Sequence, residues 1–144
     1  MSNFQLECIL ENEKHFAGVF ASDTLPKKIK PAENGLVNLE KINSPGSHWV
    51  AYYNSPTRPT VEYFDSFGLV PSNRILKYLQ TSGKPIVYNE TQLQIRSSVR
   101  CGFYCTYFIQ QRNRKKSYRQ ILKAFIQKPS LYNENKVLGK MASK

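Results

Sequence analysis

The alternation of apolar and polar positions divides the chain into strands in its first half and helices towards its end. The clearest strands are residues 48–53, His-Trp-Val-Ala-Tyr-Tyr, and residues 60–65, Thr-Val-Glu-Tyr-Phe-Asp, because both are rich in β-branched and aromatic side chains. Shorter apolar segments predict strands at 16–20, 36–42 and 86–88. Turn-forming residues separate these segments, so we expect short strands.

Helical spacing of apolar residues replaces this alternation in residues 71–80, 102–112 and 118–127. The first of these segments has a proline near its first turn and a glycine just past its end, as is typical of helix boundaries. Residues 4–12 fit either a short helix or a strand. Strands surrounded by helices, with helices dominating the end of the chain, predict an α+β fold.

The composition is that of a folded protein, with 40% hydrophobic and 12% aromatic residues among 144. This length predicts one domain, residues 1–144, with its core at about 15–127 and a basic C-terminal tail at about 134–144 that is frayed at its end. No apolar run approaches the roughly 18–20 residues that cross a bilayer. The first residues lack the basic-then-apolar pattern of a secretory signal, so we expect neither a membrane protein nor a secreted one.

The three cysteines, Cys8, Cys101 and Cys105, cannot all pair within one chain, and none has the spacing of a zinc motif. Their number and spacing predict a reducing compartment and no metal site. Cys101 is followed by glycine and by an apolar run that looks helical. Unpaired backbone N–H groups and the positive end of the helix dipole favour a thiolate at such a place. The alternative is that Cys101 is only a small buried residue.

The formal net charge is +11, from 21 Lys plus Arg against 10 Asp plus Glu. This imbalance favours attraction to polyanions, nucleic acid first, or else it is a solvated basic surface kept for solubility. The excess lies mostly on the C-terminal side of Cys101. The candidate contacts for a polyanion are Arg96, Arg100, Arg112, Arg114, Lys115 and Lys116.

The two clearest strands also predict a contact between a histidine and an aspartate. If they pair as an antiparallel hairpin with Tyr53 facing Thr60, His48 lies opposite Asp65. Directly opposed residues have Cβ atoms about 4.5–5.5 Å apart, within reach of a carboxylate–imidazole hydrogen bond. The alternative is a structural histidine and an aspartate that only forms a turn. His15, the other histidine, lies in a polar segment and is expected at the surface.

Four residues, His48, Asp65, Gln94 and Cys101, supply the groups that acyl transfer by a thiol needs. A thiolate attacks the acyl carbon, and a histidine takes and returns the proton. A carboxylate fixes the imidazole tautomer, and an amide donor stabilises the oxyanion together with a backbone N–H group. Gln94 has the better position for the amide role, and Gln92 is the second candidate.

The motifs around these residues resemble a known clan of cysteine proteases. They are Gly46-Ser-His-Trp49, Tyr63-Phe-Asp-Ser-Phe-Gly68, Leu93-Gln94 and Cys101-Gly-Phe-Tyr-Cys105. Their order resembles that of the adenovirus maturation protease (adenain) and SUMO-specific proteases. The segment Phe16–Pro26 and the small size look most like the adenovirus-type proteases of virophages and Polinton/Maverick elements.

The resemblance covers residues 15–127 and implies a papain-like α+β fold, with a mostly antiparallel or mixed sheet flanked by helices and the nucleophile at a helix N-terminus. It implies Cys101 as nucleophile, His48 as general base, Asp65 as orienting carboxylate and Gln94 as oxyanion donor. Trp49 is then expected beside the site, and Cys105 in a packing role. One departure is that the acidic residue is Asp, as in the SUMO proteases, where adenain has Glu.

The resemblance further implies a thiol endopeptidase that cleaves viral capsid or precursor proteins during virion maturation, after small residues such as glycine. Its chemistry would require no cofactor, while DNA would act as an activator. We expect a monomer that works in the host cytoplasm, virus factory or nucleus and is packaged in the virion. The alternatives are a ubiquitin or SUMO isopeptidase using the same site, and a basic nucleic-acid-binding module without enzymatic activity.

Overall fold

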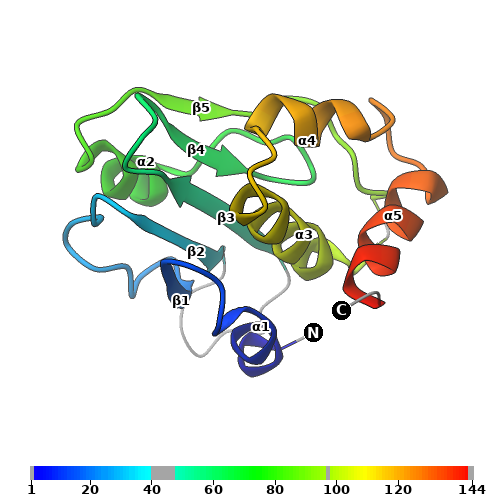
Figure 1. Ribbon diagram of the computed structural model, residues 1–144, viewed down its shortest axis with the longest axis horizontal. Coiled ribbons are helices and arrows are strands. Elements are labelled where there is room, and N and C mark those ends of the chain that lie inside the picture. The colour runs from blue at the N-terminus through cyan, green and yellow to red at the C-terminus, as the bar shows by residue number, and fades with distance from the viewer. Residues whose placement is uncertain (1, 40–47, 97, 143–144) are drawn as a thin grey trace.

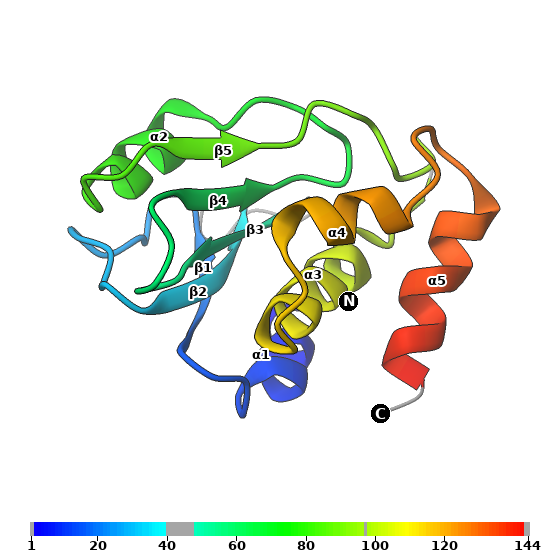
Figure 2. The ribbon, with the colours of Figure 1, turned by 45° about the horizontal axis from the view of Figure 1, so that its top comes forward.

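A five-stranded mixed sheet, with helices on both faces, forms the framework of the protein (Figures 1 and 2). The computed structural model describes residues 2–39, 48–96 and 98–142. The elements are α1 (Asn3–Leu10), β1 (Phe16–Ala21), β2 (Glu33–Asn38), β3 (Trp49–Asn54), β4 (Val61–Phe64), α2 (Asn73–Gln80), β5 (Ile86–Tyr88), α3 (Cys101–Asn113), α4 (Tyr118–Ala124) and α5 (Leu131–Ala142). This arrangement confirms the predicted α+β fold with a mixed sheet.

The strands follow one another across the sheet in chain order, β1-β2-β3-β4-β5. The two central pairs, β2–β3 and β3–β4, are antiparallel, whereas the outer pairs β1–β2 and β4–β5 are parallel. Helix α2 packs on one face of the sheet, and α1, α3, α4 and α5 contribute to the core on the other. Because both faces are covered, β2 and β4 are buried along their whole length.

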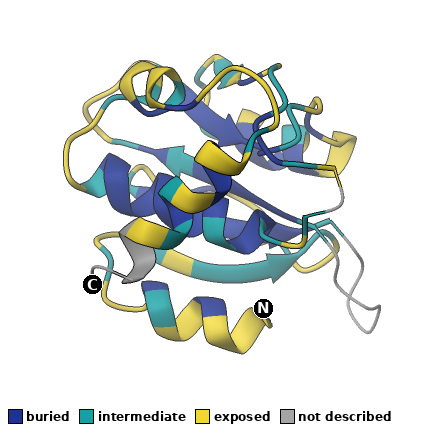
Figure 3. Cartoon of the chain, turned by 90° about the vertical axis from the view of Figure 1, so that its right-hand side faces the viewer, coloured by how far each residue is buried: buried dark blue, intermediate teal, exposed yellow. Residues whose placement is uncertain are grey.

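Helix α3 is the most deeply buried helix in the described part of the chain (Figure 3). Cys101, Tyr104, Cys105, Phe108 and Ile109 all belong to its buried surface. A helix that is apolar on most of its circumference is typical of a protein interior. The candidate nucleophile therefore begins a helix that is held by packing on several sides.

The β3–β4 register differs from the prediction by two residues. Tyr53 pairs with Glu62, not with Thr60, and Asn54 pairs with Val61. The connection has six residues in both cases, 54–59 as predicted and 55–60 as observed, so the whole turn lies one residue further along the chain. A shift of two residues leaves every side chain on its original face of the sheet, because side chains alternate with a period of two.

The core extends beyond residues 15–127 in both directions. Leu6 and Leu10 of α1 and Val137 of α5 are fully buried in the same core as α3. Glu134 is buried within α5, which runs to Ala142, so the segment predicted as a tail is helical up to that residue; residues 143–144, at the end where fraying was expected, lie outside the described residues. The hydrophobic pattern missed α5 because much of its attachment is through polar side chains.

Several element boundaries also differ from the sequence-based expectation. The segment 4–12 is helical up to Leu10 and then forms a turn, and Ser2 caps α1 through a capping box. Strand β2 begins at Glu33, three residues before the predicted start, and residues 40–42 of the predicted strand lie outside the described residues. Helix α4 ends at Ala124 rather than at residue 127.

Candidate active site

The side chains of His48 and Asp65 meet where strands β3 and β4 lie side by side. His48 immediately precedes β3 and Asp65 immediately follows β4. The Nε2 atom of His48 lies 2.7 Å from Oδ1 of Asp65. The two residues predicted to pair are therefore in direct contact, although the register that suggested the contact was wrong.

Asp65 is held in place by its own turn and by Asn89. Its Oδ1 also accepts a hydrogen bond from the backbone N–H of Phe67, at 2.8 Å. The Asn89 side chain accepts from the backbone N–H of Asp65 at 3.1 Å and donates to its carbonyl at 2.6 Å. The carboxylate is fully buried, so these bonds restrict how it can turn.

His48 is mostly buried, and its ring lies against Phe67 with the ring centroids 4.8 Å apart. Burial alone would lower its pKa, but the hydrogen bonds and charge interactions with Asp65 and Cys101 raise the pKa to about 9. Since Nε2 is engaged with Asp65, the other ring nitrogen, Nδ1, remains to serve the thiol. Nδ1 is buried.

Cys101 is the first residue of α3 and is almost completely buried. The first turn of the helix is closed by bonds from the N–H groups of Phe103 and Tyr104 to the carbonyl of Arg100. Gly102 permits close packing here, because a Cβ atom at this position would lie 3.2 Å from a methyl group of Leu6. Helix α1 therefore packs directly against the turn that presents the thiol.

Gln94 is fully buried, and both ends of its amide are engaged. Oε1 accepts a hydrogen bond from Ser66 Oγ, and Nε2 donates to the carbonyl of Ser98 at 2.9 Å. Gln92, the second candidate, donates from Nε2 to the carbonyl of Gln94 at 3.0 Å. An oxyanion role for Gln94 therefore depends on the second hydrogen of its Nε2.

Cys105 lies one helical turn after Cys101 on α3 and contacts Trp49, the first residue of β3. The Cys105 Sγ atom donates to the carbonyl of Trp49 at 3.2 Å. Complete burial raises the pKa of the Cys105 thiol well above its usual value. The Trp49 indole donates to Asn3 Oδ1 at 2.9 Å. Cys105 is therefore a neutral thiol inside the core.

Sequence reasoning missed three residues that shape this site: Phe67, Asn89 and Ser98. Phe67 lies in the quoted Asp-Ser-Phe-Gly motif, so its position beside the aspartate was a usable signal. Asn89 follows β5, a place where a buried amide often ends a strand, but nothing in the sequence connects it to Asp65. Ser98 was one of several polar residues in an irregular segment.

Arg112, one of the predicted polyanion contacts, is buried and paired with a carboxylate. Its guanidinium binds both carboxylate oxygens of Glu62, at 2.7 and 2.9 Å, and lies over the Tyr53 ring. Arg112 also lines the cavity described below, where its charge is shared with Glu62. The other five candidates lie at least partly at the surface: Arg96, Arg100, Arg114, Lys115 and Lys116.

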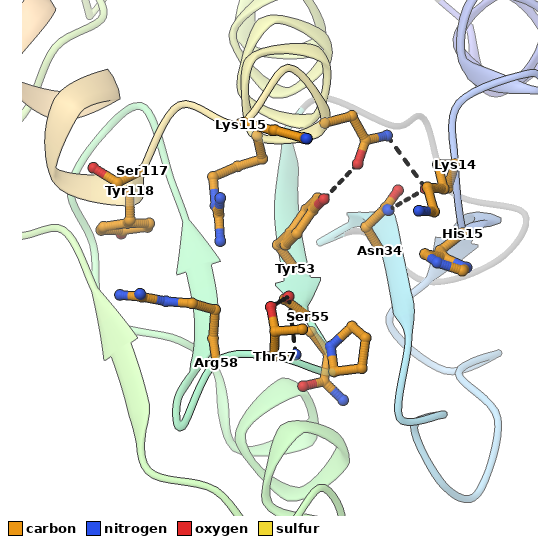
Figure 4. Close-up of a pocket in the computed structure, with 14 residues that line it drawn as sticks. Lys14, His15, Asn34, Tyr53, Ser55, Thr57, Arg58, Lys115, Ser117 and Tyr118 are labelled. Atoms are coloured by element: carbon orange, nitrogen blue, oxygen red, sulfur yellow. Dashed lines mark hydrogen bonds between the residues drawn. The ribbon is translucent and has the colours of Figure 1, made fainter.

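A cavity of about 490 Å³ lies at the opposite end of β3 from His48. Figure 4 shows Lys14 and His15 on one side of Tyr53 and Arg58 on the other. Together with Lys115 these residues form a basic lining, and no carboxylate of the described residues lines the cavity. His15 is exposed there, as expected.

Within the part of the chain that the structure describes, no group of three or more His, Cys, Asp or Glu side chains could hold a metal ion. The same residues include no helix that is both long enough and apolar enough to cross a membrane.

No protein-family model matches the sequence, and no curated protein matches it significantly. Several solved structures resemble its fold. The ASFV pS273R protease aligns over 88% of this chain and 62% of its own length, with 16% identity and a TM-score of 0.66. Its Se-Met form aligns over 67% and 40%, with 21% identity and a TM-score of 0.56. The chain has the fold of a protease.

A second protease supports the same conclusion. The SUMO protease Ulp1, with its catalytic cysteine oxidized to a sulfinic acid, aligns over 85% of this chain and 70% of its own length, with 14% identity and a TM-score of 0.51. The predicted fold class is thus confirmed. The chain spans between 40% and 62% of the length of the ASFV structures.

Proposed function

We propose that the protein is a cysteine endopeptidase in which Cys101 is the nucleophile, His48 the general base and Asp65 the orienting carboxylate. The observation that carries this proposal is the 2.7 Å contact between His48 Nε2 and Asp65 Oδ1, with Cys101 acting on the same imidazole from the start of α3. The fold likeness to the ASFV pS273R protease and to Ulp1 supports it.

The proposed cycle begins with an ion pair. A histidine whose pKa is raised to about 9 is protonated at neutral pH, and an imidazolium beside a thiol favours the thiolate. Cys101 Sγ attacks the scissile carbonyl carbon, and His48 Nδ1 gives its proton to the leaving amine as the C–N bond breaks. Water then attacks the thioester carbonyl while His48 takes a proton from it, and the C–S bond breaks to release the acid product and restore the Cys101 thiolate beside the protonated imidazole.

The negative oxygen formed in each addition step needs hydrogen-bond donors. We assign this role to the backbone N–H of Cys101, at the N-terminus of α3, and to the second Nε2 hydrogen of Gln94. Gln92 remains the alternative amide donor. The buried bonds of Gln94 to Ser66 and Ser98 would hold its amide in one orientation and so lower the cost of reorganisation.

As substrates we propose viral capsid or precursor proteins, cut after small residues during virion maturation. This assignment follows the resemblance to adenovirus-type proteases of virophages and Polinton/Maverick elements and is supported by the fold of a virus-encoded protease. On the same ground we propose that the enzyme acts in the cytoplasm, virus factory or nucleus of the host cell and is packaged in the virion. The test is to incubate candidate precursors with the wild type and with Cys101→Ala and to map new N-termini; cleavage by both proteins would exclude the assignment.

A second candidate function is removal of a ubiquitin-like protein through the same site. The fold likeness to the SUMO protease Ulp1 is the observation that favours it. Fluorogenic ubiquitin and SUMO substrates, assayed beside the capsid precursors, distinguish the two functions.

We also propose that the protein binds a nucleic-acid polyanion, which would act as an activator. The net charge of +11 and the basic cavity lined by Lys14, Arg58 and Lys115 support this role. If polyanion binding were the whole function, the protein would bind DNA without any cleavage that depends on Cys101. Loss of cleavage in Cys101→Ala therefore also tests this alternative.

A further inference from the structure

Helix α5 is attached to the segment that leads into Cys101 by two neighbouring side chains. Asn133 Nδ2 donates to the carbonyl of Leu93 at 3.1 Å, and Glu134 Oε1 accepts from Ser98 Oγ at 2.5 Å. Both α5 residues are almost completely buried. These bonds fasten residues on either side of Gln94 and so decide where this irregular segment lies.

Ser98 connects the two candidate catalytic groups. Its carbonyl accepts the Nε2 hydrogen bond of Gln94, at 2.9 Å. Its hydroxyl donates to Glu134 and accepts from the backbone N–H of Arg100, the residue just before Cys101, at 3.2 Å. A displacement of Ser98 would therefore move the proposed oxyanion donor and the start of α3 together.

The other carboxylate oxygen of Glu134, Oε2, accepts a hydrogen bond from the Tyr104 hydroxyl. Tyr104 is on the first turn of α3, three residues after Cys101, whereas Ser98 is three residues before it. One carboxylate thus joins the two segments that flank Cys101. A buried carboxylate is costly unless it is fully hydrogen-bonded, so its use here indicates a need for defined geometry rather than for packing alone.

We propose that Glu134 is a positioning residue of the active site, which fixes the Gln94 segment to the start of α3 through Ser98 and Tyr104. The proposal rests on the function proposed above, because it assigns Glu134 a role in the chemistry of Cys101. Glu134 does not touch the reacting atoms and acts only through the residues it holds.

The chain contains a matched control for this role. Glu33 is also a buried glutamate that accepts hydrogen bonds from two tyrosine hydroxyls, those of Tyr52 and Tyr78. Its tyrosines belong to the core on the α2 side of the sheet, away from the core that contains Cys101. Glu33→Gln and Glu134→Gln therefore make the same chemical change at two buried sites, of which only one flanks the nucleophile.

The experiment compares Glu134→Gln, Ser98→Ala and Glu33→Gln in the full chain, with Cys8→Ser in every protein to remove the exposed thiol. The first readout is the pH profile of Cys101 alkylation by iodoacetamide, followed by mass spectrometry. The second is kcat and KM for a fluorogenic Gly-Gly peptide amide. Thermal unfolding of each protein shows how much stability is lost.

We expect Glu134→Gln and Ser98→Ala to lower kcat about 10- to 100-fold, with KM changed less than about twofold, because a small misplacement of reacting groups has effects of this size. Both should slow Cys101 alkylation about tenfold. A variant that combines Glu134→Gln with Ser98→Ala should be alkylated no more slowly than the slower of the two single variants, because both changes break the same link. Glu33→Gln should lose comparable stability and keep both rates. If Glu134→Gln does not fold, Ser98→Ala decides, because it leaves the Glu134–Tyr104 bond in place.

Equal alkylation rates in folded Glu134→Gln, Ser98→Ala and the parent would overturn the positioning role. A fall in the alkylation rate of Glu33→Gln as large as that of Glu134→Gln would also overturn it. Alkylation requires no substrate, so this result does not depend on proteolysis. A parent protein that cleaves no substrate, yet whose alkylation responds to Glu134→Gln, would contradict the protease assignment and not the positioning role.

Discussion

The Nε2 atom of His48 contacts Oδ1 of Asp65 diagonally across the β3–β4 ladder, at 2.7 Å. Continuing the observed register by one residue sets Asp65 opposite Val50. His48 lies two residues before Val50, so by alternation it belongs to the same face of the sheet. Diagonal neighbours are farther apart than opposed ones, at about 7–8 Å, so this contact requires both side chains to lean towards each other. The turn that follows Asp65 therefore has to hold the carboxylate in place.

Gly68→Ala is expected to disturb that turn. Gly68 has φ of +70°, and an added Cβ would lie 2.7 Å from a backbone carbon of Thr91. Backbone strain together with the clash should lower the free energy of unfolding by about 2–4 kcal/mol and reduce activity. Urea denaturation and peptide hydrolysis measure the two effects.

Gly83→Ala is the control for this prediction. Gly83 has a similar φ of +75°, but nothing lies within 4 Å of an added Cβ. We expect this variant to lose about 1 kcal/mol from strain alone and to retain activity. Losses of the same size in the two variants would show that the contact with the 91–92 backbone is unimportant.

The His48–Asp65 contact also predicts how stability depends on pH. The pKa of His48 is about 9 in the folded protein, against 6.5 for an ordinary histidine. A raised pKa stabilises the folded state fully below about pH 6.5, and this contribution is lost as pH rises through about 9. The linked contribution amounts to about 3 kcal/mol.

Asp65→Asn tests this dependence because it removes the charge that favours the imidazolium. The free energy of unfolding, measured between pH 6 and pH 10, should fall more steeply in the wild type than in Asp65→Asn. Parallel curves would mean that Asp65 does not raise the pKa of His48. The comparison uses slopes, since the substitution also lowers stability at every pH.

The sequence contained enough information to find His48 and Asp65 but not to align them. Side chains alternate between the two faces of a sheet, so an error of two residues in the register still leaves His48 and Asp65 on the same face. Cys101 was identifiable because a helix start is a local feature that glycine and the following apolar run indicate. These features depend on short stretches of chain.

The remaining parts of the site depend on contacts that local patterns do not contain. Arg112 looks like a surface cation in sequence, yet Glu62, fifty residues away, pairs with it inside the core. Glu134 lies in the segment predicted as a basic tail, and Asn133 directly precedes it. Both are held by hydrogen bonds to residues 93–104, which leave no hydrophobic pattern in the sequence. Buried polar pairs have no periodic signal.

The two buried cysteines of α3 are expected to respond differently to replacement. Cys101→Ala should abolish peptide cleavage while the protein remains folded. Cys105→Ala should retain cleavage and lose about 1–2 kcal/mol of stability, because it leaves a small cavity and removes the bond to Trp49. Hydrolysis and thermal unfolding of both variants distinguish them; loss of activity in a folded Cys105→Ala would assign that thiol a part in the chemistry.

Gln94→Ala is expected to lower kcat by about 10²–10³-fold, the usual effect of removing an oxyanion donor. It should also lower stability, since the amide bonds to Ser66 and Ser98 are lost. Gln92→Ala separates the two candidates, because its amide holds only the carbonyl of Gln94. A larger fall in kcat for Gln92→Ala than for Gln94→Ala would transfer the role to Gln92.

The basic cavity predicts which charges determine polyanion binding. Binding to DNA releases condensed counterions, so the logarithm of affinity should fall linearly with the logarithm of salt concentration. Replacing Arg58 and Lys115 together by glutamine removes two lining charges and should reduce that slope by about 2. Fluorescence anisotropy of a labelled duplex, titrated at several salt concentrations, measures the slope.

Arg74 and Lys77 of α2 supply the control, because both are exposed cations outside this cavity. The double glutamine variant of these residues removes the same charge from the α2 side of the sheet, so its slope should match that of the wild type. If both pairs reduce the slope equally, binding follows net charge alone and the cavity has no special part in it. A wild-type affinity that does not change with salt would exclude the polyanion role.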